Sequence, residues 1–127
     1  MEVTGSDCKL PLGPIFQSPE SLIRAFGIER TDIFKAAALR GVSGLFPESK
    51  NPFYAGFGTK KNDLVVYSRC GISKGRIYLV NSLGEVQGTF FSSRKTFQEI
   101  DKDVDHLFPP LQPSKLNEVL NFIIIIN

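Results

Sequence analysis

The chain has 127 residues, of which 42% are hydrophobic and 22% are charged, with eleven Gly and eight Pro. This length suits one domain of ordinary size, and the composition excludes a disordered or collagen-like chain. Fifteen Lys and Arg oppose thirteen Asp and Glu, which leaves a net charge of +2. No overall field therefore marks the chain as a nucleic-acid or membrane-surface binder, and any basic site must be local.

From the cysteines and the two ends of this sequence we expect neither export nor a membrane span. Cys8 and Cys70 have neither the spacing of a zinc site nor the density of a disulfide framework, so we expect reduced thiols. The first ten residues lack the apolar core of a signal peptide. The apolar stretch near the end, residues 119–126, is too short to cross a bilayer.

Two helices are predicted in the first third of the chain, after a short strand near residues 15–16. Ser18-Pro19 is typical of a helix start, and Gly27 would end that helix. Thr31 can cap the next one. Its apolar residues recur at steps of three and four and leave Lys35, Arg40 and Ser43 on other faces: Ile33, Phe34, Ala37, Ala38, Val42 and Leu45.

The middle of the chain predicts strands joined by a helix. Residues 53–57 form an apolar run without alternation, which is typical of a parallel strand covered on both faces. Residues 58–63 read as a polar loop, followed by a helix from Leu64 to about Gly71. Residues 76–80 predict a second strand, which the turn at 81–84 leads into a hairpin-like segment at 85–87.

The last third predicts mainly helix. Thr96 and Glu99 have the spacing of a capping box, and apolar residues continue to Phe108, where Pro109-Pro110 would end the helix. A further short helix is expected from Ser114 to Leu120, before the isoleucine-rich tail. Alternating strands and helices indicate an α/β domain with a largely parallel sheet flanked by helices.

The loop at residues 58–63 is the predicted place for chemistry, because ligands of open α/β sheets bind beyond the carboxyl ends of the strands. The Asp63 carboxylate is a suitable Mg²⁺ ligand, and Lys60, Lys61 and the following helix start favour a phosphate oxygen. The alternative is that Asn62-Asp63 only caps the helix. Taken alone, Lys35 would be a solvated surface residue.

Several segments together resemble the lipins, in chain order over residues 10–110. They are Leu10-Pro11-Leu12-Gly13-Pro14-Ile15-Phe16-Gln17-Ser18-Pro19, Phe34-Lys35, Leu45-Phe46, Asn51-Pro52-Phe53-Tyr54-Ala55-Gly56-Phe57-Gly58, Asn62-Asp63, Arg76-Ile77-Tyr78-Leu79-Val80-Asn81, Gly84-Glu85 and His106-Leu107-Phe108-Pro109-Pro110. Lipins are Mg²⁺-dependent phosphatidate phosphatases of the haloacid-dehalogenase superfamily. Membrane-associated phosphatidylinositol transfer proteins share the Pro-Phe-Tyr-Ala-Gly-Phe-Gly block.

The resemblance implies roles for particular residues. Asp63 matches the acid of the family's last metal-binding loop, and Lys35 matches a lysine that neutralises the phosphoryl group and the nucleophile. Asn62 and Thr59 are candidates for contacting the phosphate or for orienting the groups around the metal. Thr59, however, stands where the family has Asn and the wider superfamily has Asp, which are stronger oxygen ligands. The family's nucleophile motif, Asp-x-Asp-Gly-Thr, does not occur in these 127 residues.

These matches imply the carboxyl-terminal part of a lipin-like phosphatase domain over residues 10–110, followed by a short helix and apolar tail over 111–127. The implied fold is a partial haloacid-dehalogenase-like sheet that lacks its first, nucleophile-bearing strand. We expect residues 53–57 and 77–80 to be left partly uncovered, and the chain alone to be inactive and weak in Mg²⁺ binding. The alternative is a non-catalytic module that binds phosphatidate or a phosphoinositide.

The implied partners are phosphatidate or a related anionic lipid at a membrane surface, and the missing amino-terminal part of the domain. The implied location is cytoplasmic, peripheral at the endoplasmic reticulum membrane, or nuclear. Nucleic acid is not an expected partner. His106 is expected to be a surface residue and Cys70 a packed or idle thiol. Solvated loops are expected for four basic residues, with contact to anionic lipid headgroups as the alternative: Lys74, Arg76, Arg94 and Lys95.

Overall fold

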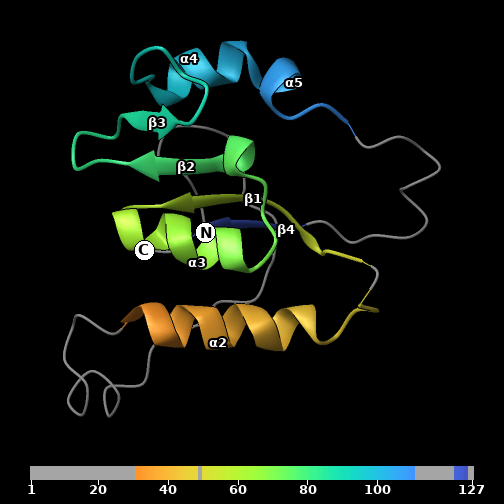
Figure 1. The fold of residues 1–127 in the computed structure, drawn as a ribbon. Helices are drawn as coiled ribbons and strands as arrows, with labels where there is room; N and C mark the ends of the chain where they lie inside the picture. Colours follow the sequence, from red (N-terminus) through yellow and green to blue (C-terminus); the bar gives the residue numbers. More distant parts are fainter. Residues whose placement is uncertain (1–30, 49, 111–121, 126–127) are drawn as a thin grey trace, which may run out of the picture.

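The computed structural model describes residues 31–48, 50–110 and 122–125, which form a sheet between two layers of helices (Figure 1). The predicted elements before residue 31 and at 114–120 lie outside the described residues. The helices are α2 (Thr31–Ser43), α3 (Lys61–Arg69), α4 (Phe97–Lys102) and α5 (Val104–Leu107), and the strands are β1 (Phe53–Gly58), β2 (Ile77–Val80), β3 (Val86–Gly88) and β4 (Phe122–Ile125). No described helix has the length and apolarity needed to cross a membrane.

The sheet has the strand order β3-β2-β1-β4. β1 pairs in parallel with both β2 and β4, and β2 pairs antiparallel with β3. The prediction of an α/β fold with a largely parallel sheet and a short hairpin is thus confirmed. The unalternated run of β1 has the expected cause, because this strand lies between two neighbours and has helices on both of its faces.

The expectation that residues 53–57 and 77–80 are left partly uncovered was wrong. β2 (Ile77–Val80) has β1 on one side and β3 on the other. β4, which comes from the isoleucine-rich tail, pairs with β1 in parallel from Phe53 to Phe57, with a register irregularity between Phe53 and Ala55. Sequence periodicity missed this pairing, because a short apolar run alone does not distinguish a strand from other buried segments. The tail therefore belongs to the sheet.

The two faces of the sheet carry different cores. On the α2–α3 side the buried residues are Leu39, Phe53, Val66, Tyr67, Ile72 and Ile77. On the α4–α5 side Tyr78, Val86 and Ile100 are buried, and partly buried aromatic residues pack around them. Tyr78 stacks on Phe57 with ring centroids 4.9 Å apart, and Phe108 lies 5.6 Å from Tyr78.

The helix predicted from Thr96 to Phe108 is interrupted. Its start is confirmed, because Thr96 Oγ1 accepts a hydrogen bond from the Glu99 backbone N–H and the Glu99 carboxylate accepts one from the Thr96 N–H. At Asp103 the backbone leaves the helical region, and α5 begins at Val104. Aspartate is a weak helix former, which apolar periodicity alone does not register.

Candidate functional site

A buried ion pair joins the two helices on one face of the sheet. Lys35 on α2 donates a hydrogen bond of 2.7 Å from its Nζ to Asp63 Oδ1 on α3. The two residues are 9% and 2% exposed, and within the described part of the chain no other charged side chain is buried. The pair lies beyond the carboxyl end of β1, as expected for a site in an α/β sheet.

Lys35 is buried although its helix pattern predicts a different face. It lies four residues before Leu39, which belongs to the core, so both side chains lie on one side of α2. The solvated position that the helix pattern alone predicts for Lys35 was therefore wrong. A lysine does not register as core in an apolar pattern, and only the presence of Asp63 on a neighbouring helix makes its burial tolerable.

The second carboxylate oxygen of Asp63 holds the turn between β1 and α3. Oδ2 accepts hydrogen bonds from the backbone N–H groups of Thr59 and Lys60, at 2.9 and 3.0 Å. The helix begins at Lys61, earlier than the predicted Leu64, so Asp63 lies in its first turn rather than in a loop. Asp63 thus performs the capping role of the alternative interpretation and also pairs with Lys35.

These contacts determine the charge state of Asp63. Burial acts to raise the pKa of its carboxyl group, but the hydrogen bonds from Lys35, Lys60 and Thr59 outweigh burial and hold the pKa below its ordinary value of 3.8. Asp63 is therefore ionised at neutral pH. The site holds a paired carboxylate and ammonium side by side in a largely water-excluded place.

Gly58, the last residue of β1, makes room for this arrangement. A Cβ atom at Gly58 would lie 2.5 Å from Asp63 Cβ and 2.7 Å from Asp63 Oδ2. Next to this site Tyr67 of α3 donates a hydrogen bond of 2.7 Å from its hydroxyl to the Phe57 carbonyl. Sequence analysis did not assign this role to Gly58, although its position directly before the polar turn is a signal of close packing.

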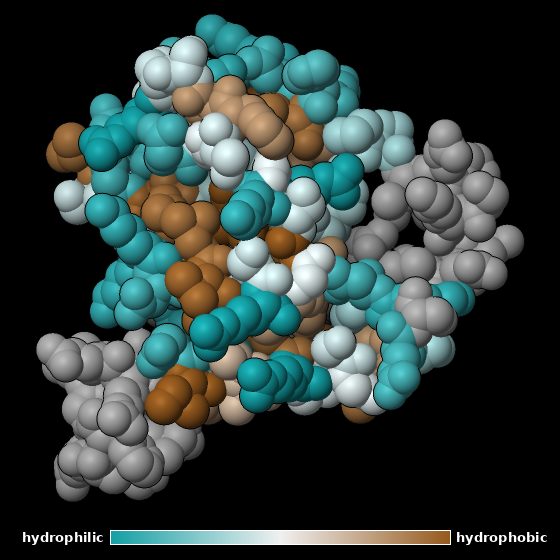
Figure 2. Space-filling model, viewed as in Figure 1, coloured by the Kyte–Doolittle hydropathy of each residue, from teal (hydrophilic) through white to brown (hydrophobic). Residues whose placement is uncertain are grey.

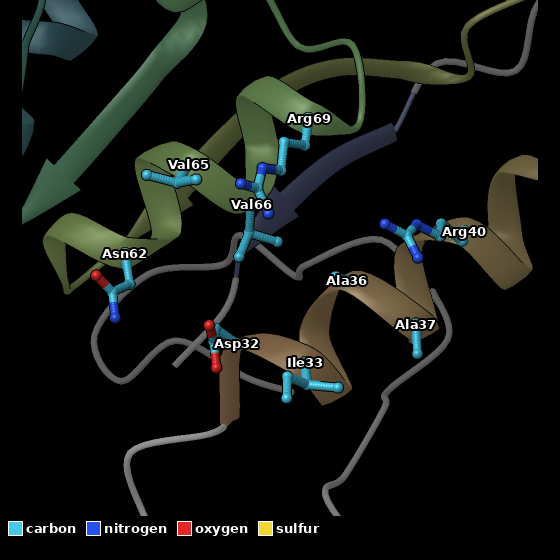
Figure 3. Close-up of a pocket in the computed structure, with 9 residues that line it drawn as sticks. All are labelled: Asp32, Ile33, Ala36, Ala37, Arg40, Asn62, Val65, Val66 and Arg69. Atoms are coloured by element: carbon cyan, nitrogen blue, oxygen red, sulfur yellow. The ribbon is translucent and has the colours of Figure 1, made fainter.

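The other two predicted site residues, Thr59 and Asn62, lie in different places. Thr59 is exposed and contacts Asp63 through its backbone N–H, not its hydroxyl. Asn62 is exposed and lines a groove of about 420 Å³ between α2 and α3 (Figure 3). In that view Asn62 and Asp32 lie near the starts of the two helices, and Arg40 and Arg69 lie near their ends. Asn62 therefore belongs to the groove and not to the ion pair.

The described residues do not fit Mg²⁺ on their own. Mg²⁺ in proteins is held by one or two carboxylates with phosphate and water oxygens. Asp63 supplies one carboxylate, which already accepts three hydrogen bonds, and the buried ammonium of Lys35 would repel a cation there. Nowhere in the described part of the chain do three or more His, Cys, Asp or Glu side chains gather as a metal site would require.

The remaining candidates take ordinary roles. His106 is exposed, as expected. Burial raises the pKa of the half-buried Cys70 thiol, which makes it a poor nucleophile. Three of the four basic residues make side-chain contacts: the Arg76 guanidinium lies 4.0 Å from the centre of the Tyr54 ring, Lys95 pairs with Asp103 at 2.8 Å, and Arg94 Nη1 lies 3.8 Å from Glu85 Oε2.

Comparison with known proteins defines the class to which this α/β domain belongs. Residues 1–109 match the family model LNS2 (Lipin/Ned1/Smp2), which covers most of the chain. The chain therefore belongs to the lipin family, and the predicted resemblance is confirmed.

Similar proteins come from animals, plants and fungi. The chain is 38% identical over 114 residues to the mouse protein phosphatidate phosphatase LPIN3, which is 86% of this chain and 13% of that protein. It is 39% identical over 106 residues to phosphatidate phosphatase PAH1 of Arabidopsis thaliana, 80% of this chain and 12% of that protein. It is 34% identical over 122 residues to nuclear elongation and deformation protein 1 of Schizosaccharomyces pombe, 89% of this chain and 19% of that protein. The chain thus spans less than a fifth of each of these relatives.

Proposed function

We propose that this chain is the carboxyl-terminal part of a lipin-type phosphatidate phosphatase domain with a haloacid-dehalogenase-like sheet. The observation that carries the proposal is the buried Lys35–Asp63 pair, with Nζ and Oδ1 2.7 Å apart, beyond the carboxyl end of β1. A buried ion pair is costly to form and adds little net stability, so its presence at the ligand-binding edge of a sheet favours a functional role.

In this proposal Lys35 stabilises the negative charge of a phosphoryl group. Phosphoryl transfer depends mainly on cations that are held in place before the reaction, and Asp63 holds the Lys35 ammonium in one position. The N–H groups of Thr59 and Lys60 hold Asp63 in turn. A carboxylate nucleophile must come from outside these 127 residues, because the Asp-x-Asp-Gly-Thr string is absent from them.

In this proposal Mg²⁺ binds only when another segment supplies further acidic side chains. The metal of a phosphatase would supply further positive charge at the phosphoryl group. Because Asp63 is a single carboxylate engaged by Lys35, we propose that the chain alone binds Mg²⁺ weakly or not at all and needs acids from another segment. Titration with MgCl₂ should therefore not raise the melting temperature of the chain more than NaCl at matched ionic strength.

A second candidate is a non-catalytic module that binds phosphatidate or a phosphoinositide. The saturated carboxylate of Asp63 favours it, because a binding site needs neither a metal ligand nor a nucleophile. In either case we propose a cytoplasmic or nuclear protein that is peripheral at membranes, including the endoplasmic reticulum. Both candidates share anionic lipid as the partner and differ in whether phosphate is released.

A segment exchange separates the two candidates. Residues 1–110 of this chain replace the matching segment of the Arabidopsis protein PAH1, to which the chain is 39% identical over 106 residues. If the segment belongs to an enzyme, the chimaera should release phosphate from phosphatidate micelles with Mg²⁺, and this chain alone should not. Lys35→Ala in the chimaera should lower kcat by at least about a hundredfold, as loss of a preorganised charge does.

The control is Lys102→Ala, which removes an exposed lysine on α4 and should leave turnover unchanged. Circular dichroism on each chimaera checks that it is folded. Full turnover by the Lys35→Ala chimaera would contradict the role of Lys35. A folded but inactive parent chimaera would favour the binding module.

A further inference from the structure

One edge of the sheet combines the Lys35–Asp63 pair with an exposed apolar tip and two lysines. β1 and β2 run in parallel, with Gly58 opposite Leu79, so the chain leaves both strands at the same end. After β1 come Lys60 and Lys61, and after β2 comes the turn at residues 81–84. In Figure 1 this turn and the start of α3 both lie at the left-hand end of the sheet.

Leu83 is presented to solvent at the tip of this turn and is 80% exposed. The turn is well held. Asn81 Oδ1 accepts hydrogen bonds from the N–H groups of Leu83 and Glu85, and Gly84 takes a φ of 76°, which suits glycine. Figure 2 shows hydrophobic surface at this turn, with hydrophilic surface around it. A rigid turn that displays a leucine gains no folding energy from that side chain.

Lys60 and Lys61 are also unfavourable for folding where they stand. Both are exposed, and Lys61 is the first residue of α3. The amino end of a helix carries partial positive charge, so lysines there are repelled and acidic residues are preferred. Nearby, Arg94 Nη1 lies 3.8 Å from Glu85 Oε2, so the acid next to the tip has its own cation. The edge therefore retains net positive charge.

We propose that Lys60, Lys61 and Leu83 form a membrane-docking edge that binds the surface of an anionic lipid bilayer. The inference rests on the proposed function, since it names the surface through which the Lys35–Asp63 site meets lipid. Two lysines match anionic headgroups, and a single projecting leucine can enter the headgroup boundary. A protein partner would need a larger complementary surface than one leucine and two flexible lysines supply.

The opposite end of the sheet provides a matched control. Phe90 is 83% exposed and lies against Gly75, and Lys74 accepts a hydrogen bond from Thr89 Oγ1 through its carbonyl. Both residues lie by the start of β2, where no Lys35–Asp63 pair is present. Each end thus has an exposed apolar residue, Leu83 or Phe90, with at least one exposed lysine, and only one end carries the candidate site.

The test is flotation of the full chain with vesicles of phosphatidylcholine, alone or with phosphatidylserine or phosphatidate. We expect binding to both anionic vesicles that weakens with salt. The double variant Lys60→Ala/Lys61→Ala should lower the partition coefficient about 25-fold, which is about fivefold for each lysine. Leu83→Ser should lower it severalfold, and both Phe90→Ser and Lys74→Ala should leave it unchanged.

The outcomes separate the docking edge from the proposed function. If the Lys60, Lys61 and Leu83 variants bind the anionic vesicles as well as the wild type does, the docking edge is overturned and the proposed function is not. A larger loss from Phe90→Ser than from Leu83→Ser moves the contact to the opposite end and also overturns it. Absence of wild-type binding to either anionic vesicle contradicts both the edge and the proposed lipid partner. Thermal unfolding of each variant excludes loss of fold as the cause.

Discussion

The two helical layers carry ion pairs of nearly equal length in very different surroundings. Lys35–Asp63 measures 2.7 Å with side chains 10% and 2% exposed, whereas Lys95–Asp103 measures 2.8 Å with side chains 30% and 51% exposed. Water screens the charges of Lys95–Asp103, the outer pair. In Lys35–Asp63, the inner pair, the two side chains contact each other instead of water, and Asp63 also accepts hydrogen bonds from two backbone N–H groups. Distance alone therefore does not rank the pairs, and burial does.

The cores next to the two pairs also differ in how fully they are buried. Around Lys35–Asp63 the chain packs tightly, with Gly58 in direct contact with Asp63 and Tyr67 bonded to the Phe57 carbonyl. On the side of Lys95–Asp103 the buried core is smaller, namely Tyr78, Val86 and Ile100 with partly buried residues around them, and the helices are short. The α2–α3 layer should thus tolerate change poorly, and the α4–α5 layer should tolerate it well.

The largest expected effect comes from breaking the inner pair. Asp63→Ala leaves the Lys35 ammonium buried without its partner and removes the acceptor for two backbone N–H groups. We expect it to lower the free energy of unfolding by about 3–5 kcal/mol, measured by urea denaturation. The double variant Lys35→Met/Asp63→Leu should recover much of the loss, because no uncompensated buried charge remains. A loss as large in the double variant as in Asp63→Ala would contradict the explanation.

Crowding the inner site should cost less than breaking it. Gly58→Ala places a methyl group against the Asp63 side chain and should lower the free energy of unfolding by about 1–3 kcal/mol. The matched change is Gly75→Ala, whose Cβ would meet the outer end of the Phe90 ring, an exposed side chain that can rotate away. Thermal melts should rank Gly58→Ala as the more harmful of the two. Equal melting temperatures would mean that Asp63 moves freely.

Protonation of Asp63 by acid should lower the free energy of unfolding by less than Asp63→Ala does, since a protonated Asp63 still accepts hydrogen bonds. Its folded pKa lies below the ordinary 3.8, so the unfolded chain takes up the proton first as the pH falls. The stabilisation is thus complete above about pH 4 and is lost as the pH falls through the folded pKa. Lys35→Met/Asp63→Leu should lose less stability over that range, in melts followed from neutral pH to about pH 2. If the wild type and Lys35→Met/Asp63→Leu lose the same stability as the pH falls, the assignment of this loss to Asp63 is contradicted.

The smallest effect is expected at the outer pair. Lys95→Ala should change the melting temperature by no more than the error of measurement, because an exposed pair gains little from its charge interaction. A double-mutant cycle with Asp103→Ala isolates the coupling between the two side chains. A coupling as strong as that between Lys35 and Asp63 would show that burial does not distinguish the two layers.

Local patterns in the sequence predict much of this molecule. The unalternated apolar run at β1, the capping box at Thr96 and the turn after β2 are encoded by neighbouring residues, and all three are found. The family resemblance also pointed to Lys35 and Asp63 as candidate site residues, and the structure shows that these two side chains are in contact. The same patterns missed the pairing of β4 with β1, because a strand more than sixty residues away leaves no local trace.

The sequence by itself determined the α/β class and the family, and it proposed Lys35 and Asp63 as candidate site residues, since each depends on residue types in local order. Only the tertiary structure decided that Lys35 is buried, that its ammonium meets Asp63 and that Thr59 contributes its backbone N–H rather than its hydroxyl. The physical reason is that the helix pattern records which residues are apolar. It does not record which charge on a distant helix can compensate a buried lysine.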